Sequence, residues 1–121
     1  MRYLLLVHHD EEAFGKRNEA ERQHMLQESV RLAQQLYASG QYLGAAPLHP
    51  TSATTCVRVR DGKPLVTDGP FVETREQIGG YFLIDAKNLD EAIGIAARIP
   101  GARIGTVEVR PVREVAGLPT D

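Results

Sequence analysis

The 121-residue sequence has a single cysteine, no excess of basic residues and no long hydrophobic run. One thiol, Cys56, cannot form an internal disulfide, which is typical of proteins from a reducing compartment. Fourteen basic against sixteen acidic residues give a net charge of −2, and aromatic residues do not alternate with basic ones, so no nucleic-acid-binding surface is predicted. The N-terminal apolar run is too short for a signal peptide or a membrane span. These features predict a cytoplasmic protein with neither a nucleic acid nor a membrane as partner.

The remaining composition is that of a globular protein. Hydrophobic residues make up 42% and charged residues 25% of the chain, so disorder is not expected. The length predicts one domain over residues 1–121, with a core from about residue 2 to residue 113 and a tail over residues 114–121.

Hydrophobic periodicity predicts strands alternating with two helices. Helical periodicity covers Arg17–Ser39, and Asn88 is a predicted N-cap for a second helix over Leu89–Ile99. Five further segments have the pattern of strands: residues 2–8, 41–47, 55–67 as a hairpin turning at Asp61-Gly62, 79–86 with a double glycine suited to a bulge, and 105–112. We expect an α+β fold, a mostly antiparallel sheet with two helices on one face. The uncovered face predicts a homodimer packed sheet to sheet.

The stretch "DGPF", Asp68 to Phe71, has two interpretations. In the structural one it is a rigid Asx-type turn, with Phe71 pinning the loop to the core. In the functional one Asp68 is a general base or hydrogen-bond acceptor at the mouth of a sheet cleft, with Thr67 and Glu73 among the polar groups around it. The residues alone leave both open.

Histidine and tyrosine side chains supply candidate partners for Asp68. Alternation places His8 on the face of Leu4 and Leu6, and His9 on the opposite face. Adjacent strand residues do not easily share a metal ion, so we expect no metal site, and His8 is the preferred acid–base partner. The Tyr81 hydroxyl either enters the cleft or caps the core.

Two sequence features concern possible ligands: arginines on a strand and the absence of cofactor-binding motifs. Arg58 and Arg60 either bind an anion or, as we prefer, pair with Glu108 across the sheet. No Gly-rich phosphate loop, cysteine cluster or lysine in an apolar setting is present, so no cofactor is expected.

The motifs "TTCVRVRDGKPLVTDGPF", "ETREQIGGYFLID" and "LDEAIGIAARIPGARIGTVEVRPV" together resemble the YCII-related family, in its DGPF-domain branch. The resemblance, over about nine-tenths of the chain, implies a ferredoxin-like fold that dimerises into an α/β barrel. The superfamily includes small enzymes acting on lactones and chlorinated aromatics, and some DGPF members lie near, or are fused to, extracytoplasmic-function sigma factors. Other relatives carry a first-helix histidine, discussed as half of a His–Asp catalytic pair, where this chain has Ser29. The sequence thus departs from that pattern.

Two hypotheses for function remain at this stage. In the first, a homodimer binds a small, partly apolar molecule and carries out cofactor-free proton transfer of lyase or isomerase type. The candidate catalytic residues are Asp68, His8 and Tyr81, and the candidate ligand-binding residues are Ser29, Thr67, Phe71 and Glu73. The alternative is a non-catalytic interaction or regulatory module, acting with an extracytoplasmic-function sigma factor. A cleft with converging polar groups favours the first hypothesis, and a filled one favours the second.

Overall fold

The computed structural model describes residues 1–119 and shows an α+β protein with two antiparallel sheets. Four strands form the larger sheet in the order β2–β5–β1–β6, and β3 pairs only with β4. The strands are β1 Arg2–His9, β2 Tyr42–Pro47, β3 Thr55–Arg60, β4 Lys63–Asp68, β5 Gln77–Asp85 and β6 Thr106–Pro111. The α-helices of the described residues are α1 Glu11–Gly15, α2 Glu19–Ala38 and α3 Leu89–Ala96, with 3₁₀ turns at Thr51–Ala53 and Pro100–Arg103.

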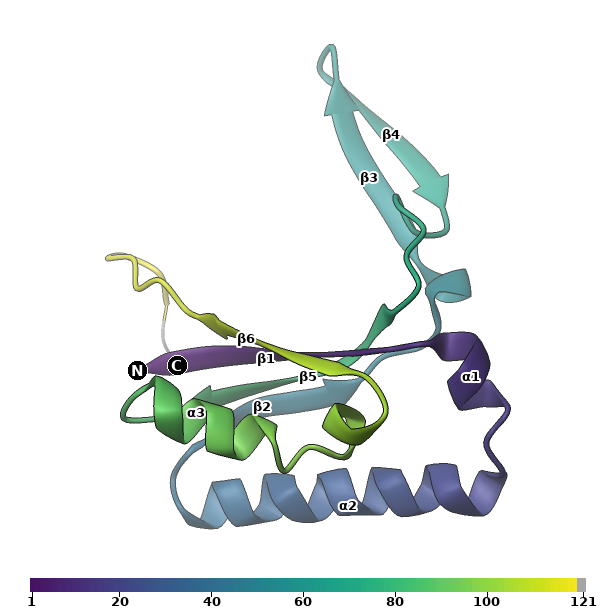
Figure 1. Cartoon of the computed structure of the whole chain (residues 1–121). Coiled ribbons are helices and arrows are strands. Elements are labelled where there is room, and N and C mark those ends of the chain that lie inside the picture. Colours follow the sequence, from purple (N-terminus) through teal and green to yellow (C-terminus); the bar gives the residue numbers. More distant parts are fainter. Residues whose placement is uncertain (120–121) are drawn as a thin grey trace.

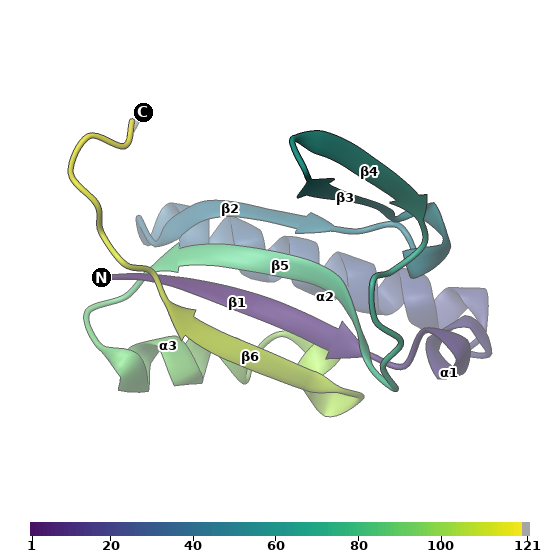
Figure 2. The ribbon, with the colours of Figure 1, turned by 90° about the horizontal axis from the view of Figure 1, so that it is seen from above.

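The strand order and connections are compatible with a ferredoxin-like fold. Helices α2 and α3 lie against one face of the four-stranded sheet (Figure 1), and the opposite face carries no helix (Figure 2). The predicted antiparallel sheet with two helices on one face is therefore confirmed. The short helix α1 was not predicted; the Asp10 side chain caps it by accepting a hydrogen bond from the Ala13 amide at 3.0 Å.

The hydrophobic core lies between this sheet and its two helices. Alternate residues of β1 and β5 point into it, and Leu5 and Ile84 are completely buried. From α2 come Leu32 and Leu36, and from α3 comes Ala92 among others. Burial of these side chains fixes the register of the sheet, because a shift of one residue would turn the apolar set toward water.

Local signals fix both ends of α2. The Asn18 side chain accepts a hydrogen bond from the Glu21 amide at 2.8 Å, so the helix begins after Asn18 and not at the predicted Arg17. At the other end Gly40 adopts φ +77°, and the Gln41 amide donates to the Leu36 carbonyl at 2.8 Å. This geometry is a Schellman motif, and glycine at its left-handed position ends the helix as predicted.

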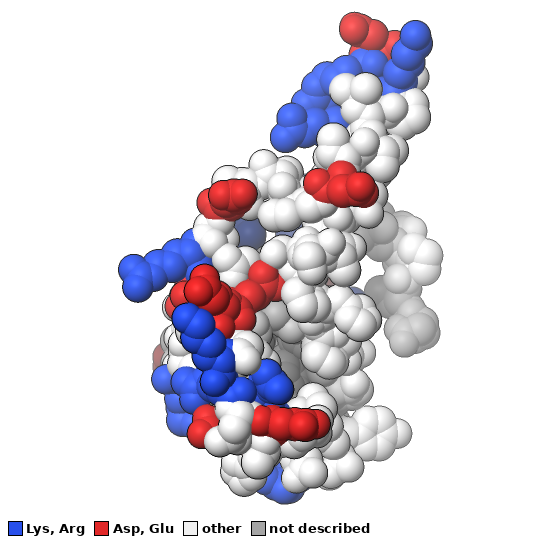
Figure 3. All heavy atoms as spheres, turned by 90° about the vertical axis from the view of Figure 1, so that its right-hand side faces the viewer, with Lys and Arg blue, Asp and Glu red and all other residues white. Residues whose placement is uncertain are grey.

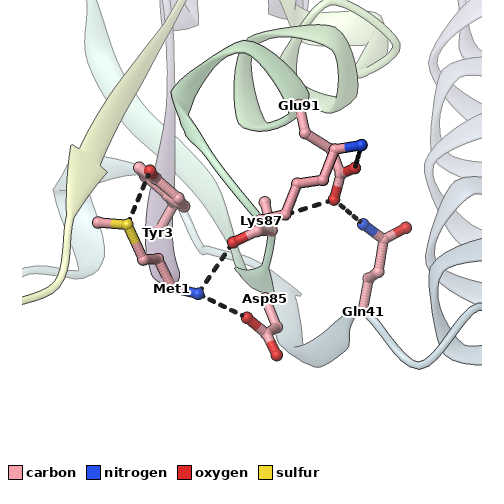
Figure 4. Close-up of polar contacts among 7 residues, drawn as sticks. Met1, Tyr3, Gln41, Asp85, Lys87 and Glu91 are labelled. Carbon is pink, nitrogen blue, oxygen red and sulfur yellow. Dashed lines mark hydrogen bonds and ion pairs between the residues drawn. The ribbon is translucent and has the colours of Figure 1, made fainter.

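Helix α3 is capped as predicted and tied to the sheet at its N-terminus. The Asn88 side chain accepts from the Glu91 amide at 2.9 Å. Figure 4 shows the Glu91 carboxylate in turn accepting hydrogen bonds from the Lys87 amide at 3.2 Å and from the Gln41 side chain at 2.8 Å. The helix ends at Ala96, three residues before the predicted end, because the chain turns there toward the 3₁₀ turn at Pro100.

The hairpin of β3 and β4, hereafter the arm, projects away from the body of the molecule (Figure 1). Its predicted turn is present, with Asp61 at φ 51° and Gly62 at φ 74°. The arm forms a sheet of its own, so "DGPF" connects the arm to the main sheet and does not join two strands of one sheet. The physical reason is that alternation predicts pairing between neighbouring strands but does not show which sheet the pair joins.

The "DGPF" stretch closes the arm at its root. The Gly69 amide donates to the Thr54 carbonyl at 2.7 Å, and Gly69 has φ +86°, a value that a residue with a side chain rarely adopts. Among the described residues no donor bonds the Asp68 carboxylate, so the Asx-type turn does not form. Phe71 is 75% exposed, which corrects the expectation that it pins the loop to the core.

The uncovered face of the sheet combines apolar and charged side chains. Leu4, Leu6 and Leu83 lie on it, only partly buried. On the same face, the Glu108 carboxylate lies 2.9 Å from His8 Nε2, within hydrogen-bonding distance. It also lies 3.7 Å from Arg110 Nε. The predicted pairing of Glu108 with the arm arginines is therefore wrong.

Two further predictions concern the ends of the chain and membranes. Residues 114–119 of the predicted tail follow β6 without helix or strand, and its last residues, 120–121, lie outside the described part. None of the helices in residues 1–119 combines the length and the hydropathy needed to cross a membrane.

Candidate functional site

A cavity of about 470 Å³ lies between α2 and the helix-facing side of the sheet, next to the edge strand β2. Most of its lining is apolar, and it includes Val7, Met25, Ala33, Ala45, Phe82 and Ile104. Leu26, Val30 and Tyr37 of α2 also line it, yet they expose 43%, 48% and 75% of their surface. The cavity is therefore open to solvent along this row of α2 side chains.

One end of the cavity contains an imidazole held in a fixed position. A register shift between Val7 and His8 marks a bulge, which leaves Gly79 of β5 without a partner on β1. A Cβ on Gly79 would lie 2.3 Å from His9 Cε1, so the ring of His9 occupies the space that a side chain there would fill. On its other side the ring stacks on Phe14, with centroids 4.7 Å apart and planes 5° from parallel.

The electrostatics of this end favour an uncharged imidazole. Burial lowers the pKa of His9 below its ordinary value of 6.5, and this effect outweighs the carboxylates of Glu11, Asp10 and Glu76, which raise it. At neutral pH the ring therefore offers one hydrogen-bond donor and one acceptor, and it is able to take up a proton from a bound molecule.

The other polar lining residues lie along α2 and at its far end. Arg22 lines the cavity beside the His9 end and donates one hydrogen bond from Nη1 to the Gly15 carbonyl at 3.0 Å. Ser29 lies further along, and its hydroxyl donates to the Met25 carbonyl at 3.1 Å. At the opposite end Tyr37 and Tyr42 meet edge to face with centroids 6.3 Å apart. The cavity thus has a polar end with a cation and an aromatic end.

The residues predicted as a site are distributed over three regions of the molecule. Ser29 lines the cavity. Tyr81 borders it from β5, but it pairs with Leu6, so its side chain points to the uncovered face. His8 lies on the uncovered sheet face against Glu108. The remaining predicted residues belong to the exposed arm and the loop after it: Asp68, Thr67, Phe71 and Glu73. The structure does not bring this last group to the cavity within one chain.

His9, Phe14 and Arg22 were not among the site residues predicted from the sequence. A signal for His9 was present, because alternation places it on the inward face of β1 with Leu5 and Val7. The double glycine at Gly79 and Gly80 was read as a bulge, and the bulge is present, but its use as space for a ring requires the pairing register. Phe14 reaches this end from the unpredicted helix α1, and Arg22 reaches it from the first turn of α2.

Metal binding has no support from clustered ligands in the described part of the chain. Among residues 1–119, no three or more His, Cys, Asp or Glu side chains form a group that could hold a metal ion.

Comparison with known proteins gives a family but no reaction. The model of the YCII-related domain matches residues 1–116. An uncharacterised protein of Rhizobium meliloti (strain 1021) is 33% identical over 114 residues, which span 93% of this chain and 92% of that protein. Both matches run through the cavity, the arm and the main sheet alike. The chain therefore belongs to the YCII-related domain family.

Proposed function

We propose that this protein binds a small, largely apolar molecule in the cavity between α2 and the sheet. The observation that carries the proposal is the cavity itself, about 470 Å³ with a mainly apolar lining. Ligand sites typically occupy roughly 300–1,000 Å³ and combine apolar walls with a few polar groups that orient the ligand. Here His9, Arg22 and Ser29 are those groups.

We propose further that any reaction at this site is a cofactor-free proton transfer. An uncharged, partly buried imidazole held by Phe14 and Gly79 is suited to accept a proton from a carbon or oxygen atom of the ligand. Returning the proton to a different atom isomerises the ligand, and returning it with loss of a leaving group completes an elimination. The register pairs Tyr81 with Leu6, so its side chain points to the uncovered face and its hydroxyl does not enter this cavity. Roles for Asp68, His8 and Tyr81 stay predictions.

A fluorescent apolar probe tests the binding proposal. N-phenyl-1-naphthylamine becomes fluorescent in apolar surroundings, so a titration measures its Kd. Ser29→Leu places additional methyl groups in the cavity and is expected to weaken binding about tenfold or more, because an occupied volume excludes the probe. Gln27→Leu adds the same side chain to an exposed position of α2 outside the cavity, and it should leave the Kd unchanged.

The two leucine variants also define the contradicting result. Equal probe affinity in both variants and in the unchanged protein would place the probe elsewhere. Melting temperatures of all three proteins, measured alongside, separate loss of the site from loss of the fold.

We propose the sheet-to-sheet homodimer, with its α/β barrel, as the assembly of this protein. Leu4, Leu6 and Leu83 on the uncovered face support it, because apolar side chains on an exposed sheet face are stabilised by a partner. The "TDGPF" and "EQIGGY" motifs support membership of the DGPF branch, and the single Cys56 supports a cytoplasmic location. An association with a sigma factor stays a prediction.

A further inference from the structure

The α1 end of the cavity contains a cation without a carboxylate partner. The ion pairs found among residues 1–119 do not include Arg22, although seven join other charged groups. Its guanidinium is only partly exposed and uses Nη1 for the Gly15 carbonyl at 3.0 Å. A guanidinium has five N–H donors in a planar fork that matches a carboxylate or phosphate group, so most of its donors remain for a ligand.

His9 adds a neutral hydrogen-bonding group at the same end. Its ring is confined between Phe14 and the bare backbone of Gly79, and both His9 and Arg22 line the cavity. An anionic ligand group placed there gains the charge of Arg22 and a hydrogen bond from the imidazole. The carboxylates of Glu11, Asp10 and Glu76 act on His9 from outside the cavity lining and oppose part of this gain.

From this end the apolar lining extends along α2 to Tyr37 and Tyr42. Arg22 and Tyr37 are separated by 15 residues of one helix, which corresponds to about 22 Å. The cavity is therefore elongated, with its cation at one end only.

We infer that the natural ligand is an elongated apolar molecule with an acidic group, and that the acidic group binds at Arg22 and His9. This inference rests on the proposed function and names the ligand class of the same site. The apolar part of the ligand lies along α2, where Leu26, Val30 and Ala33 face the cavity.

Two probes that share one ring system test the inference. 8-Anilinonaphthalene-1-sulfonate carries an acidic group, whereas N-phenyl-1-naphthylamine has the same rings without it. In Arg22→Gln the Kd of the sulfonate should rise about tenfold or more, since a charge-assisted hydrogen bond is lost, and the Kd of the neutral probe should change less than about twofold. Arg31→Gln, on an exposed site of the same helix outside the cavity, should change neither Kd.

The outcomes separate this inference from the function on which it rests. Arg22→Gln without effect on sulfonate binding overturns the acidic-group inference and leaves the apolar site standing. Failure of both probes to bind the unchanged protein overturns the proposed function as well. A parallel loss of both probes in Arg22→Gln, at an unchanged melting temperature, shows that Arg22 shapes the cavity and also overturns the inference.

The arm supports a second, independent inference about an interaction surface. Its register places Val57, Val59, Pro64 and Val66 on one face, and Cys56, Arg58, Arg60, Lys63, Leu65 and Thr67 on the other. The three valines of the first face expose 64%, 61% and 63% of their surface. Figure 3 shows lysine and arginine gathered on the upper part of the arm. An isolated two-stranded ribbon is only marginally stable in water, so the apolar face needs a cover.

The root of the arm is held in a fixed direction. The Glu11 carboxylate accepts hydrogen bonds from the Thr51 amide at 2.8 Å and the Thr51 hydroxyl at 2.6 Å, just before β3. Where the chain returns from the arm, just before β5, the Glu76 carboxylate accepts a hydrogen bond from the Thr106 hydroxyl at 3.0 Å. So anchored, the arm rises on the side of the main sheet that the helices leave uncovered (Figure 1).

Interface area favours a second copy of this chain as the cover. At about 4.8 Å between strands and 3.3 Å per residue, two main-sheet faces bury about 900 Å² together, below the roughly 1,200–2,000 Å² of stable interfaces. Each arm has a face of about 200 Å² and would cover an equal area on the partner, so two arms raise the total buried area to about 1,700 Å². We propose that the apolar face of each arm, formed by Val57, Val59, Pro64 and Val66, packs on a second copy and completes the sheet-to-sheet dimer.

Light scattering after gel filtration tests the arm contact. The double substitution Val57→Lys with Val66→Lys should weaken the dimer about 30-fold or more, because buried unpaired charges are costly. Leu65→Lys adds the same charge to the opposite arm face and should leave the dimer intact. Amide exchange of residues 55–68 should also slow as the concentration of the unchanged protein rises.

Each outcome decides one claim. A dimer unaffected by Val57→Lys with Val66→Lys but lost in Leu6→Lys overturns the arm contact and keeps the sheet contact. An unchanged protein that is monomeric at about 50 μM overturns both. Arm amides whose exchange does not depend on protein concentration also contradict the arm contact.

Discussion

The body and the arm of this protein are built from the same kinds of residues, but they differ in what those residues contact. In the body, alternate side chains of β1 and β5 such as Leu5 and Ile84 are fully buried beneath α2 and α3. In the arm, Val57 and Val66 alternate just as regularly and remain more than 60% exposed. The arm has well-formed pairing without a core. Strand pattern therefore predicts pairing, whereas stability and ligand sites depend on a second layer.

The largest expected difference between the regions comes from one substitution made in each. Leu36→Ala removes a side chain that is 99% buried and should lower the free energy of unfolding by about 2–5 kcal/mol. Leu65→Ala in the arm, where the side chain is 49% exposed, should cost less than about 0.5 kcal/mol. Urea unfolding monitored by circular dichroism measures both values. Similar losses in the two variants would mean that the arm belongs to the cooperative core.

A second pair of variants tests the space around His9. Gly79→Ala puts a methyl group where the ring lies and should cost about 1–3 kcal/mol, together with weaker probe binding in the cavity. Gly94→Ala in α3 meets nothing within 4 Å and should stabilise the protein by up to about 1 kcal/mol. If Gly79→Ala keeps full stability and full probe affinity, the imidazole is not confined as described.

A substitution at the turn of the arm should change amide exchange in the arm alone. Gly62 has φ +74°, so Gly62→Ala introduces about 1 kcal/mol of backbone strain at the arm tip. We expect faster amide exchange in β3 and β4 and unchanged exchange in β1 and β5. Faster exchange throughout the main sheet would contradict the separation of the two regions.

The smallest expected effect is a pH dependence confined to the body. Burial lowers the pKa of His9 in the folded protein, so between that value and 6.5 only the unfolded chain binds the proton. The resulting stability is present above pH 6.5 and is lost as the pH falls through the folded pKa. Asp10, Glu11 and Glu76 oppose the shift, and Arg22 shares the cavity.

The control for this prediction is another histidine of the same chain. Between pH 7.5 and pH 5, His9→Gln should lose less free energy of unfolding than the unchanged protein does. It should also lose less than His24→Gln, which is altered at an exposed position of α2. Equal losses in all three proteins would show that His9 does not titrate as described.

Much of the body could be predicted from sequence because its signals are local. The caps at Asn88 and Gly40, the alternation of the strands and the apolar stripe of α2 predicted the antiparallel sheet and two helices. Helix α1 was missed because its five residues are too short for a periodic pattern.

The candidate site was harder to predict because it depends on register. Ser29 was selected and lines the cavity, but the side chain of Tyr81 points to the uncovered face. Asp68 was favoured for its unusual neighbours and lies on the arm. His9 gains its position from Gly79, 70 residues away, through a bulge whose place only the pairing reveals. Arg22 was overlooked as one of many charged residues of a helix, since its lack of a carboxylate partner is a property of the folded chain.

The central claim is that the body, and not the arm or the uncovered sheet face, holds the ligand site. Nuclear Overhauser effects between N-phenyl-1-naphthylamine and the methyl groups of the labelled protein test it directly. We predict contacts from the probe to Val7, Leu26 and Val30, which line the cavity. Contacts to Val57 and Val66 of the arm, or to Leu4 and Leu6 of the uncovered face, would contradict the claim.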